Sequence, residues 1–165
     1  MTAVAQSKFS PPSIDSAVHR PRLFDRLSAC ADARVTLILG QAAQGKSVLA
    51  ATWLAASDRP FAWINLDGGD RDPGNFFLSL VQALAPHLSE TDVAYLSALP
   101  AVSVDLGGEP NYDKYVAPLR ERLTRDLHIV VDDLEQLPFD APLFGLLQAL
   151  VTAGPLGARW MLLSR

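Results

Sequence analysis

The feature that most constrains this chain is a glycine-bounded loop between an apolar run and a helix-forming run. Val35–Leu39 are β-branched or apolar without polar alternation, which predicts a strand buried on both faces of a parallel sheet. Residues 46–56 are rich in Ala and Leu and predict a helix. The connecting residues, Gly40-Gln41-Ala42-Ala43-Gln44-Gly45-Lys46-Ser47, fit the pattern G-x-x-x-x-G-K-[ST] at every fixed position. The loop therefore stands in the strand-to-helix context that this pattern requires.

This loop predicts a site for the phosphates of a nucleotide. Glycines let the backbone turn so that several amides point at one phosphate, and the following helix adds unpaired N–H groups and the positive end of its dipole. Lys46 would reach the β- and γ-phosphates, and the Ser47 hydroxyl would ligate Mg²⁺. The alternative is a glycine-containing turn with a solvated lysine, which the strand-to-helix context disfavours. We expect ATP or ADP with Mg²⁺, held by residues 40–47 together with Val48.

Apolar runs and helical stripes alternate along the rest of the chain. Further strands are expected at residues 61–66, 127–133 and 160–165. Strand and helix in alternation predict a parallel sheet covered on both faces, here an α/β three-layer sandwich of the P-loop NTPase kind with four strands. We expect one nucleotide-binding domain over residues 18–165, preceded by a flexible arm of residues 1–17.

The segments between these strands carry recognisable helix ends. Asp72 is expected to cap a helix with Pro73 just inside it, and Ser89 begins a capping-box sequence. Residues 100–111 contain two glycines and two prolines and predict a loop. A helix is expected over much of residues 112–125, interrupted or restarted at Pro118.

Asp132 follows the apolar residues 129–131 and predicts a second part of the site. A carboxylate at the carboxyl tip of a parallel strand points into the crevice where ligands bind, and there Asp132 could hold Mg²⁺ through water. Asp133 is the candidate to orient or polarise the attacking water. Apolar strands also end in aspartate as a turn or cap residue. The phosphate loop favours the magnesium role for Asp132. For Asp133 two roles stay open, orienting the attacking water and serving as a turn or cap residue.

Composition narrows the class of protein. The net charge of −4 and a sequence pI of about 5.2 disfavour a domain that grips duplex DNA by itself, because such domains usually carry a basic face. The single cysteine, Cys30, cannot form an internal disulfide and suits a reducing cytoplasm. Residues 1–10 lack the charged start and apolar core of a signal peptide. We expect a soluble cytoplasmic protein that neither enters a membrane nor binds nucleic acid directly.

Five segments occur in an order that is similar to a known family. They are V-H-R-P-R-L at residues 18–23, the phosphate loop, W-I-N-L-D-G-G-D-R-D-P at 63–73, V-V-D-D at 130–133 and L-L-S-R at 162–165. From about residue 8 to residue 165 the chain resembles the ATPase domain of MalT-type regulators. These are the large ATP-binding members of the LuxR family, AAA-like signal-transduction ATPases with numerous domains. The W-x-x-L-D-x-x-D-x-D-P stretch is the most distinctive element, because phosphate binding in general does not need it.

The resemblance implies a switch module of a transcriptional regulator rather than a metabolic enzyme. In that family an inducer binds a distant repeat domain, ADP is exchanged for ATP, the protein oligomerises and transcription is activated, while hydrolysis is slow. By the family pattern, Val18 and Arg20 would lie near the adenine and ribose. Arg165 would be the sensor arginine that contacts the γ-phosphate. The alternative for Arg20 is a solvated arginine beside a helix start, and the alternative for Arg165 is an exposed residue at the chain end.

The chain also departs from the family pattern. Ser47 replaces the common threonine, although either hydroxyl can ligate Mg²⁺. The family continues beyond this point into a fifth strand, a helical lid and further domains that end in a DNA-binding helix-turn-helix. We therefore expect a sheet truncated before its fifth strand, with residues 35–39 at an exposed edge. Such a protein would be marginally soluble, would self-associate or contact other domains, and would bind nucleotide weakly.

Two other functions stay open, and two residue sets are assigned to structure. Asp133 and Arg165 are the catalytic candidates of the switch module, and the first other function is a stand-alone P-loop ATPase or kinase. The second is a truncated partner-binding fragment with a dormant nucleotide site. Three tryptophans are expected to pack in the interior rather than bind ligands: Trp53, Trp63 and Trp160. Three aspartates are expected to serve turns and caps rather than a metal: Asp67, Asp70 and Asp72.

Overall fold

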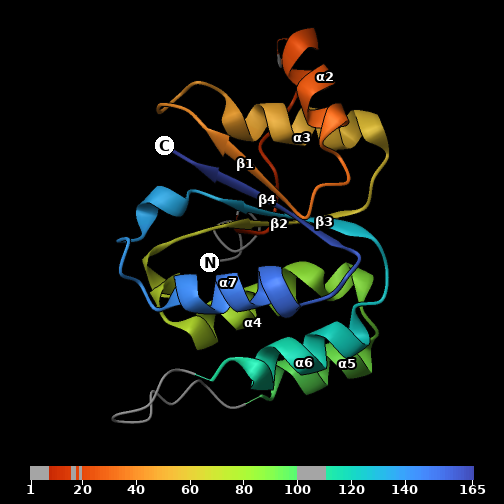
Figure 1. Cartoon of the computed structure of the whole chain (residues 1–165), viewed down its shortest axis with the longest axis vertical. Helices are drawn as coiled ribbons and strands as arrows, with labels where there is room; N and C mark the ends of the chain where they lie inside the picture. Colours follow the sequence, from red (N-terminus) through yellow and green to blue (C-terminus); the bar gives the residue numbers. More distant parts are fainter. Residues whose placement is uncertain (1–7, 16–17, 19, 100–110) are drawn as a thin grey trace. The chain divides into compact units, whose positions relative to one another are not determined.

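A computed structural model describes residues 8–15, 18, 20–99 and 111–165 of the chain (Figure 1). Four strands form a parallel sheet in the order β1-β4-β3-β2. They are β1 (Val35–Leu39), β2 (Phe61–Asn65), β3 (Leu127–Asp132) and β4 (Ala158–Ser164). The described part of the chain also contains six α-helices. The α/β class and the four-stranded parallel sheet are confirmed, and the first and fourth strands are neighbours.

The chain divides into two compact units. The sheet unit comprises Met1–Asn65, Leu127–Glu135 and Arg159–Arg165, and the helical unit comprises Leu66–Asp126 and Gln136–Ala158. The predicted single domain over residues 18–165 stays a prediction. The predicted arm is described only at residues 8–15, and the predicted loop at residues 100–111 lies outside the described residues except for Asn111.

The sheet unit places two helices on one face of the sheet, α2 (Pro21–Ala29) and α3 (Lys46–Ser57) (Figure 1). Pro21 begins α2, where its missing N–H costs nothing, and α3 ends at Ser57, followed by Asp58 in a left-handed conformation with φ 50°. α2 buries Leu27 against the core, and α3 buries Ala50, Ala51, Trp53 and Leu54. The buried residues between them are Leu27, Ala31, Ala50, Ala51, Trp53, Leu54, Trp63, Val130, Met161 and Leu163.

β1 departs from the expected burial. Val35, Leu37 and Leu39 are 39%, 56% and 63% exposed, so the prediction of a strand buried on both faces is wrong. Val35, Leu37 and Leu39 share one face of β1, and that face is exposed along the strand, which pairs only with β4 at the edge of the described sheet. Ile38 points the other way and packs against the core formed with α2 and α3. The expected exposed edge is therefore confirmed.

The helical unit contains four α-helices, α4 (Pro73–Leu84), α5 (Glu90–Ser97), α6 (Asp113–Arg122) and α7 (Leu143–Ala153), and the short 3₁₀ turns η1 (Gly68–Arg71) and η2 (Ala85–His87). α4 packs against α5 and α7, and α6 packs against the same two helices. Asp72 accepts from the Asn75 amide at 2.9 Å and Ser89 from the Asp92 amide at 3.1 Å, which confirms both predicted caps.

Pro118 lies inside α6 without the predicted interruption. Proline removes one helical hydrogen bond and crowds the preceding turn, yet α6 runs through it. Buried Tyr115 and Val116 precede the proline and buried Leu119 follows it, so packing anchors the helix on both sides. Tertiary burial outweighs the local preference here.

The tryptophans predicted to pack in the interior are buried, and the aspartates predicted to serve turns and caps do so. Trp53, Trp63 and Trp160 are 3%, 1% and 1% exposed. Asp70, itself 1% exposed, accepts from the Asp67 amide at 2.9 Å and from the Ser79 hydroxyl at 2.9 Å, which fixes the turn before α4. In the part of the chain that the structure describes, no helix is both long and apolar enough to cross a membrane.

Candidate nucleotide site

The predicted phosphate loop runs from the end of β1 to the first turn of α3. The Gly40 amide donates to the Ser164 carbonyl at 3.2 Å, so the loop starts beside the end of β4. Ala43 has φ 60° and Gly45 has φ 76°. Alternation of left-handed and ordinary backbone turns successive amides toward the same concavity, which is the geometry of an anion-binding nest. Glycine adopts this conformation without strain at position 45, whereas Ala43 adopts it at a cost.

The Gln44 side chain folds back across the loop. Its Oε1 atom accepts from the Gln41 amide at 2.9 Å. A Cβ atom on Gly40 would lie 2.6 Å from this oxygen, so a larger residue at position 40 would displace the Gln44 side chain from the Gln41 amide. The loop is thus closed upon itself by one of its own side chains.

Lys46 is bonded to the same loop. Its Nζ atom donates to the carbonyl of Gly40 at 2.9 Å and to that of Gln41 at 3.2 Å. The side chain lines a hollow of about 370 Å³ together with Gly45 and Leu39. The lysine therefore faces a cavity beside the loop and holds carbonyl oxygens there.

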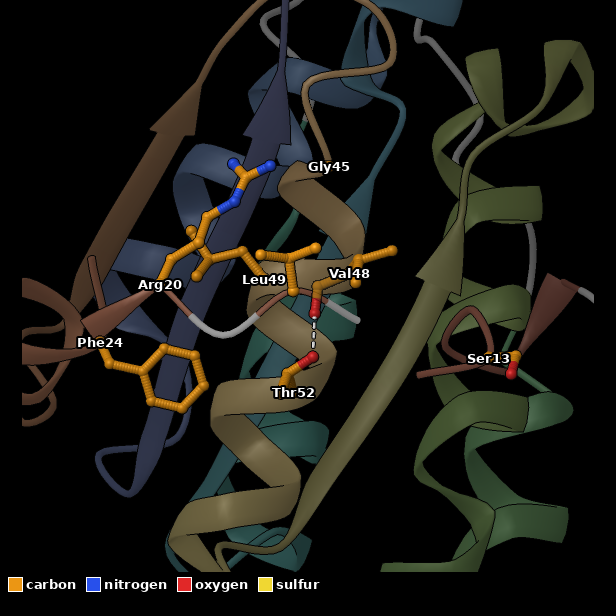
Figure 2. A pocket seen from close by; sticks show the side chains of 8 residues that line it. Ser13, Arg20, Phe24, Gly45, Val48, Leu49 and Thr52 are labelled. Atoms are coloured by element: carbon orange, nitrogen blue, oxygen red, sulfur yellow. Dashed lines mark hydrogen bonds between the residues drawn. The ribbon is translucent and has the colours of Figure 1, made fainter. Parts of the chain in front are cut away.

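Arg20 reaches the loop from the segment before α2. Its Nη1 atom donates to the Gln44 carbonyl at 3.0 Å, 24 residues further along the chain. Figure 2 shows the guanidinium pointing to the Gly45 end of α3, with Phe24 on the same side. A cavity of about 170 Å³ lies here, lined by Ser13, Val18, Arg20, Phe24, Gly45, Val48, Leu49 and Thr52. The structure thus brings Val18, Arg20 and Val48 to one cavity next to the loop.

Ser47 and Asp132 meet although 85 residues separate them in the sequence. The Ser47 hydroxyl donates a hydrogen bond to the Asp132 carboxylate, which is 3% exposed at the end of β3. Burial raises the pKa of Asp132, and the bonds from Ser47 and from the Asp133 amide oppose that rise. The two residues predicted for Mg²⁺ therefore touch.

Asp133 directly follows β3 in a left-handed conformation, with φ 61°. Its amide donates to Asp132 Oδ1 at 2.8 Å. Burial raises the pKa of Asp133, the carboxylates of Asp132 and Glu135 raise it further, and Lys46 and Arg165 oppose the rise. Strained backbone at Ala43 and Asp133 thus falls at the two sides of one site, which is where such strain is commonly retained for function.

Glu135 is the site residue that sequence reasoning missed. It lies in the 3₁₀ turn η3 (Leu134–Gln136), and its Oε1 atom is 2.9 Å from Nε of Arg165. Its charge so soon after two aspartates was the one signal that could have singled it out. The predicted sensor arginine is therefore paired with a carboxylate at the carboxyl end of the sheet.

The donor set fits a magnesium nucleotide. Mg²⁺ prefers one or two carboxylates with water and phosphate oxygens rather than a cage made only of protein ligands. The touching hydroxyl and carboxylate of Ser47 and Asp132 offer such a set beside the N-terminus of α3. Among the described residues no group of three or more His, Cys, Asp or Glu side chains is arranged to hold a metal ion by itself. The phosphates would have to complete the coordination.

This fold and site occur in a chain with partial homology to HTH-type transcriptional regulators. The relatives are named MalT. The chain is 36% identical over 75 residues to MalT of Vibrio cholerae, which covers 45% of this chain and 8% of that protein. It is 35% identical over 92 residues to MalT of Cronobacter sakazakii, with 53% and 10% covered. It is 40% identical over 79 residues to MalT of Yersinia enterocolitica, with 47% and 9% covered. The matches thus span a tenth or less of these regulators. No family model matches the chain.

Proposed function

We propose that this chain is the ATP- or ADP-binding switch module of a signal-responsive transcriptional regulator. The observation that carries the proposal is the bond between Ser47, at the end of the phosphate loop, and Asp132, at the tip of β3. Partial homology to MalT supports the regulator class. The P-loop NTPase three-layer sandwich, a cytoplasmic location and contact with a second copy or with other domains are parts of the same proposal.

The phosphate side of the site is assigned to residues 40–48. Unpaired amides at the start of α3 and the positive end of its dipole attract an anion. Lys46 exchanges the carbonyls of Gly40 and Gln41 for phosphate oxygens, a stronger charge-assisted partner. Ser47 and Asp132 hold Mg²⁺, which when bound neutralises phosphate charge. Val18 and Arg20, which line one cavity with Phe24, take the base and ribose side.

Hydrolysis is slow at most in this proposal. Asp133 orients or polarises a water, and its raised pKa makes it a better proton acceptor than an ordinary aspartate. Arg165 senses the third phosphate. A stand-alone ATPase or kinase is the second candidate, because the same carboxylate could support turnover. A partner-binding fragment with a dormant site is the third.

Calorimetric titration of Mg-ADP and of a non-hydrolysable Mg-ATP analogue tests the proposal. We expect Lys46→Ala to weaken both affinities by about tenfold or more, because a charge-assisted bond to phosphate contributes roughly 1.5–3 kcal/mol. Lys114→Ala, the same change on α6, is the matched control and should bind like the unmodified chain.

Three outcomes separate the candidates. Tight ADP retention with phosphate release near zero supports the switch. Brisk phosphate release supports the enzyme instead. Nucleotide affinity that Lys46→Ala leaves unchanged rejects the phosphate-loop site and leaves the partner-binding fragment.

A further inference from the structure

The ion pair between Glu135 and Arg165 lies at the rim of the proposed nucleotide site. Ser164 accepts the Gly40 amide, so Arg165 follows directly after the residue that anchors the start of the phosphate loop. Arg165 is 59% exposed and Glu135 is 18% exposed. The arginine thus has room to move, while its carboxylate partner is held in the fold.

Only one of the two carboxylate oxygens of Glu135 has a hydrogen-bond partner among the described residues. One oxygen, Oε1, receives Arg165 at 2.9 Å, whereas Oε2 is buried without a hydrogen-bond partner among the described residues. A buried carboxylate oxygen left in this way is costly, so the single bond to Arg165 is what the side chain depends on. Moving the arginine away would remove that bond.

The charges around the pair oppose an incoming phosphate. Asp132, Asp133 and Glu135 gather at the end of β3, and Lys46 and Arg165 are the cations that act on Asp133. Glu135 neutralises one of these two cations. An additional phosphate at this rim must therefore compete with Glu135 for Arg165.

We propose that Glu135 is a specificity-determining residue that restrains Arg165 and so biases the site toward nucleoside diphosphate over triphosphate. The inference rests on the proposed function, since it concerns the same site. A diphosphate needs no cation at the position of the third phosphate and binds with the pair intact. A triphosphate can bind Arg165 through its third phosphate only if the ion pair between Glu135 and Arg165 breaks, so part of its affinity is lost.

The test compares the affinities of the 165-residue chain for Mg-ADP and for a non-hydrolysable Mg-ATP analogue. Glu135→Gln removes the charge while keeping the shape, and should tighten binding of the analogue by about three- to fivefold with Mg-ADP unchanged. Arg165→Gln should abolish the effect, so that Glu135→Gln changes nothing in the double variant. Glu121→Gln is the matched control, because Glu121 is an exposed glutamate paired with Arg122 on α6.

If Glu135 had a merely structural role, Glu135→Gln would lower the affinities for both nucleotides together, and that result would overturn the proposal. An unchanged ratio of the two affinities would overturn it as well. If the unmodified chain bound neither nucleotide, the proposed function itself would fail and the restraint with it. If the ratio of the two affinities stayed constant in Glu135→Gln while Lys46→Ala still weakened binding of both nucleotides, only the role of Glu135 would be rejected.

Discussion

Arg20 donates to the Gln44 carbonyl at 3.0 Å and thereby ties the segment before α2 to the phosphate loop. Because the acceptor is a backbone atom of the loop, this arginine can position the loop as well as line the neighbouring cavity. We expect Arg20→Ala to weaken Mg-ADP binding by about fivefold, less than the tenfold or more of a buried charged hydrogen bond, because this bond is exposed. Calorimetric titration measures the change.

A control for this change is available on α2. Arg22 is also exposed but lines a separate hollow with Asp25 and Arg26, so Arg22→Ala should leave the affinity unaltered. Arg20→Lys keeps the charge but lacks the planar guanidinium, so its affinity for Mg-ADP should lie between those of Arg20→Ala and the unmodified chain. Equal affinities for Arg20→Ala and the unmodified chain would show that the loop keeps its shape without this bond.

Burial of the Asp132 carboxylate gives the site a cost in stability. Burial raises the pKa of Asp132 in the folded chain, so the folded state holds its proton more tightly than the unfolded state. The free energy of unfolding therefore falls as the pH rises from the ordinary carboxyl range, about pH 4, through the raised pKa of Asp132. Above that raised pKa the full cost of the buried charge is present. Without nucleotide, Asp132→Asn should raise the denaturation midpoint at pH 7 by a few degrees.

The same substitution should have the opposite effect on ligand binding. An asparagine side chain lacks the charge proposed to hold Mg²⁺, so added Mg-ADP should raise the midpoint of the Asp132→Asn variant less than that of the unmodified chain. The difference between the two chains without nucleotide should shrink at pH 4. Asp140→Asn, an exposed aspartate, serves as the control. A midpoint that falls at pH 7 would mean that the bonds from Ser47 and Asp133 outweigh the cost of burial.

Much of this site follows from local sequence patterns. The residues of the loop are contiguous, and apolar runs that end in a glycine or an aspartate mark the carboxyl ends of strands. Ser47 and Asp132 meet because parallel strands present those ends at one edge of the sheet, a rule that needs no side-chain detail. The strand boundaries and the caps at Asp72 and Ser89 are equally local.

Other features depend on neighbours that the pattern cannot specify. An apolar strand can have the same sequence whether one of its faces is covered or both are, so the sequence does not show that the face of β1 carrying Leu37 is exposed. The bonds of Arg20 to Gln44 and of Glu135 to Arg165 depend on the directions of long side chains. Pro118 favoured a break, and only the burial around it explains why α6 continues.

The exposed edge of β1 leads to a prediction about self-association. Leu37 and Leu39 are 56% and 63% exposed on a strand that pairs only with β4, and an apolar edge with free backbone groups invites pairing with another chain. We expect sedimentation velocity to show association that grows with protein concentration. Leu37→Lys should shift the population toward monomer, because a lysine on an edge strand opposes pairing. Its nucleotide affinity should be kept, since Leu37 does not line the cavities at the loop.

Leu156→Lys provides the matched control. Leu156 is 84% exposed in the helical unit, so this variant carries the same gain of charge and loss of exposed apolar surface without touching the edge strand. It should associate like the unmodified chain if β1 is responsible. Equal dissociation of both lysine variants would assign the effect to net charge, and a monodisperse, heat-stable monomer of the unmodified chain would contradict the role of the edge altogether.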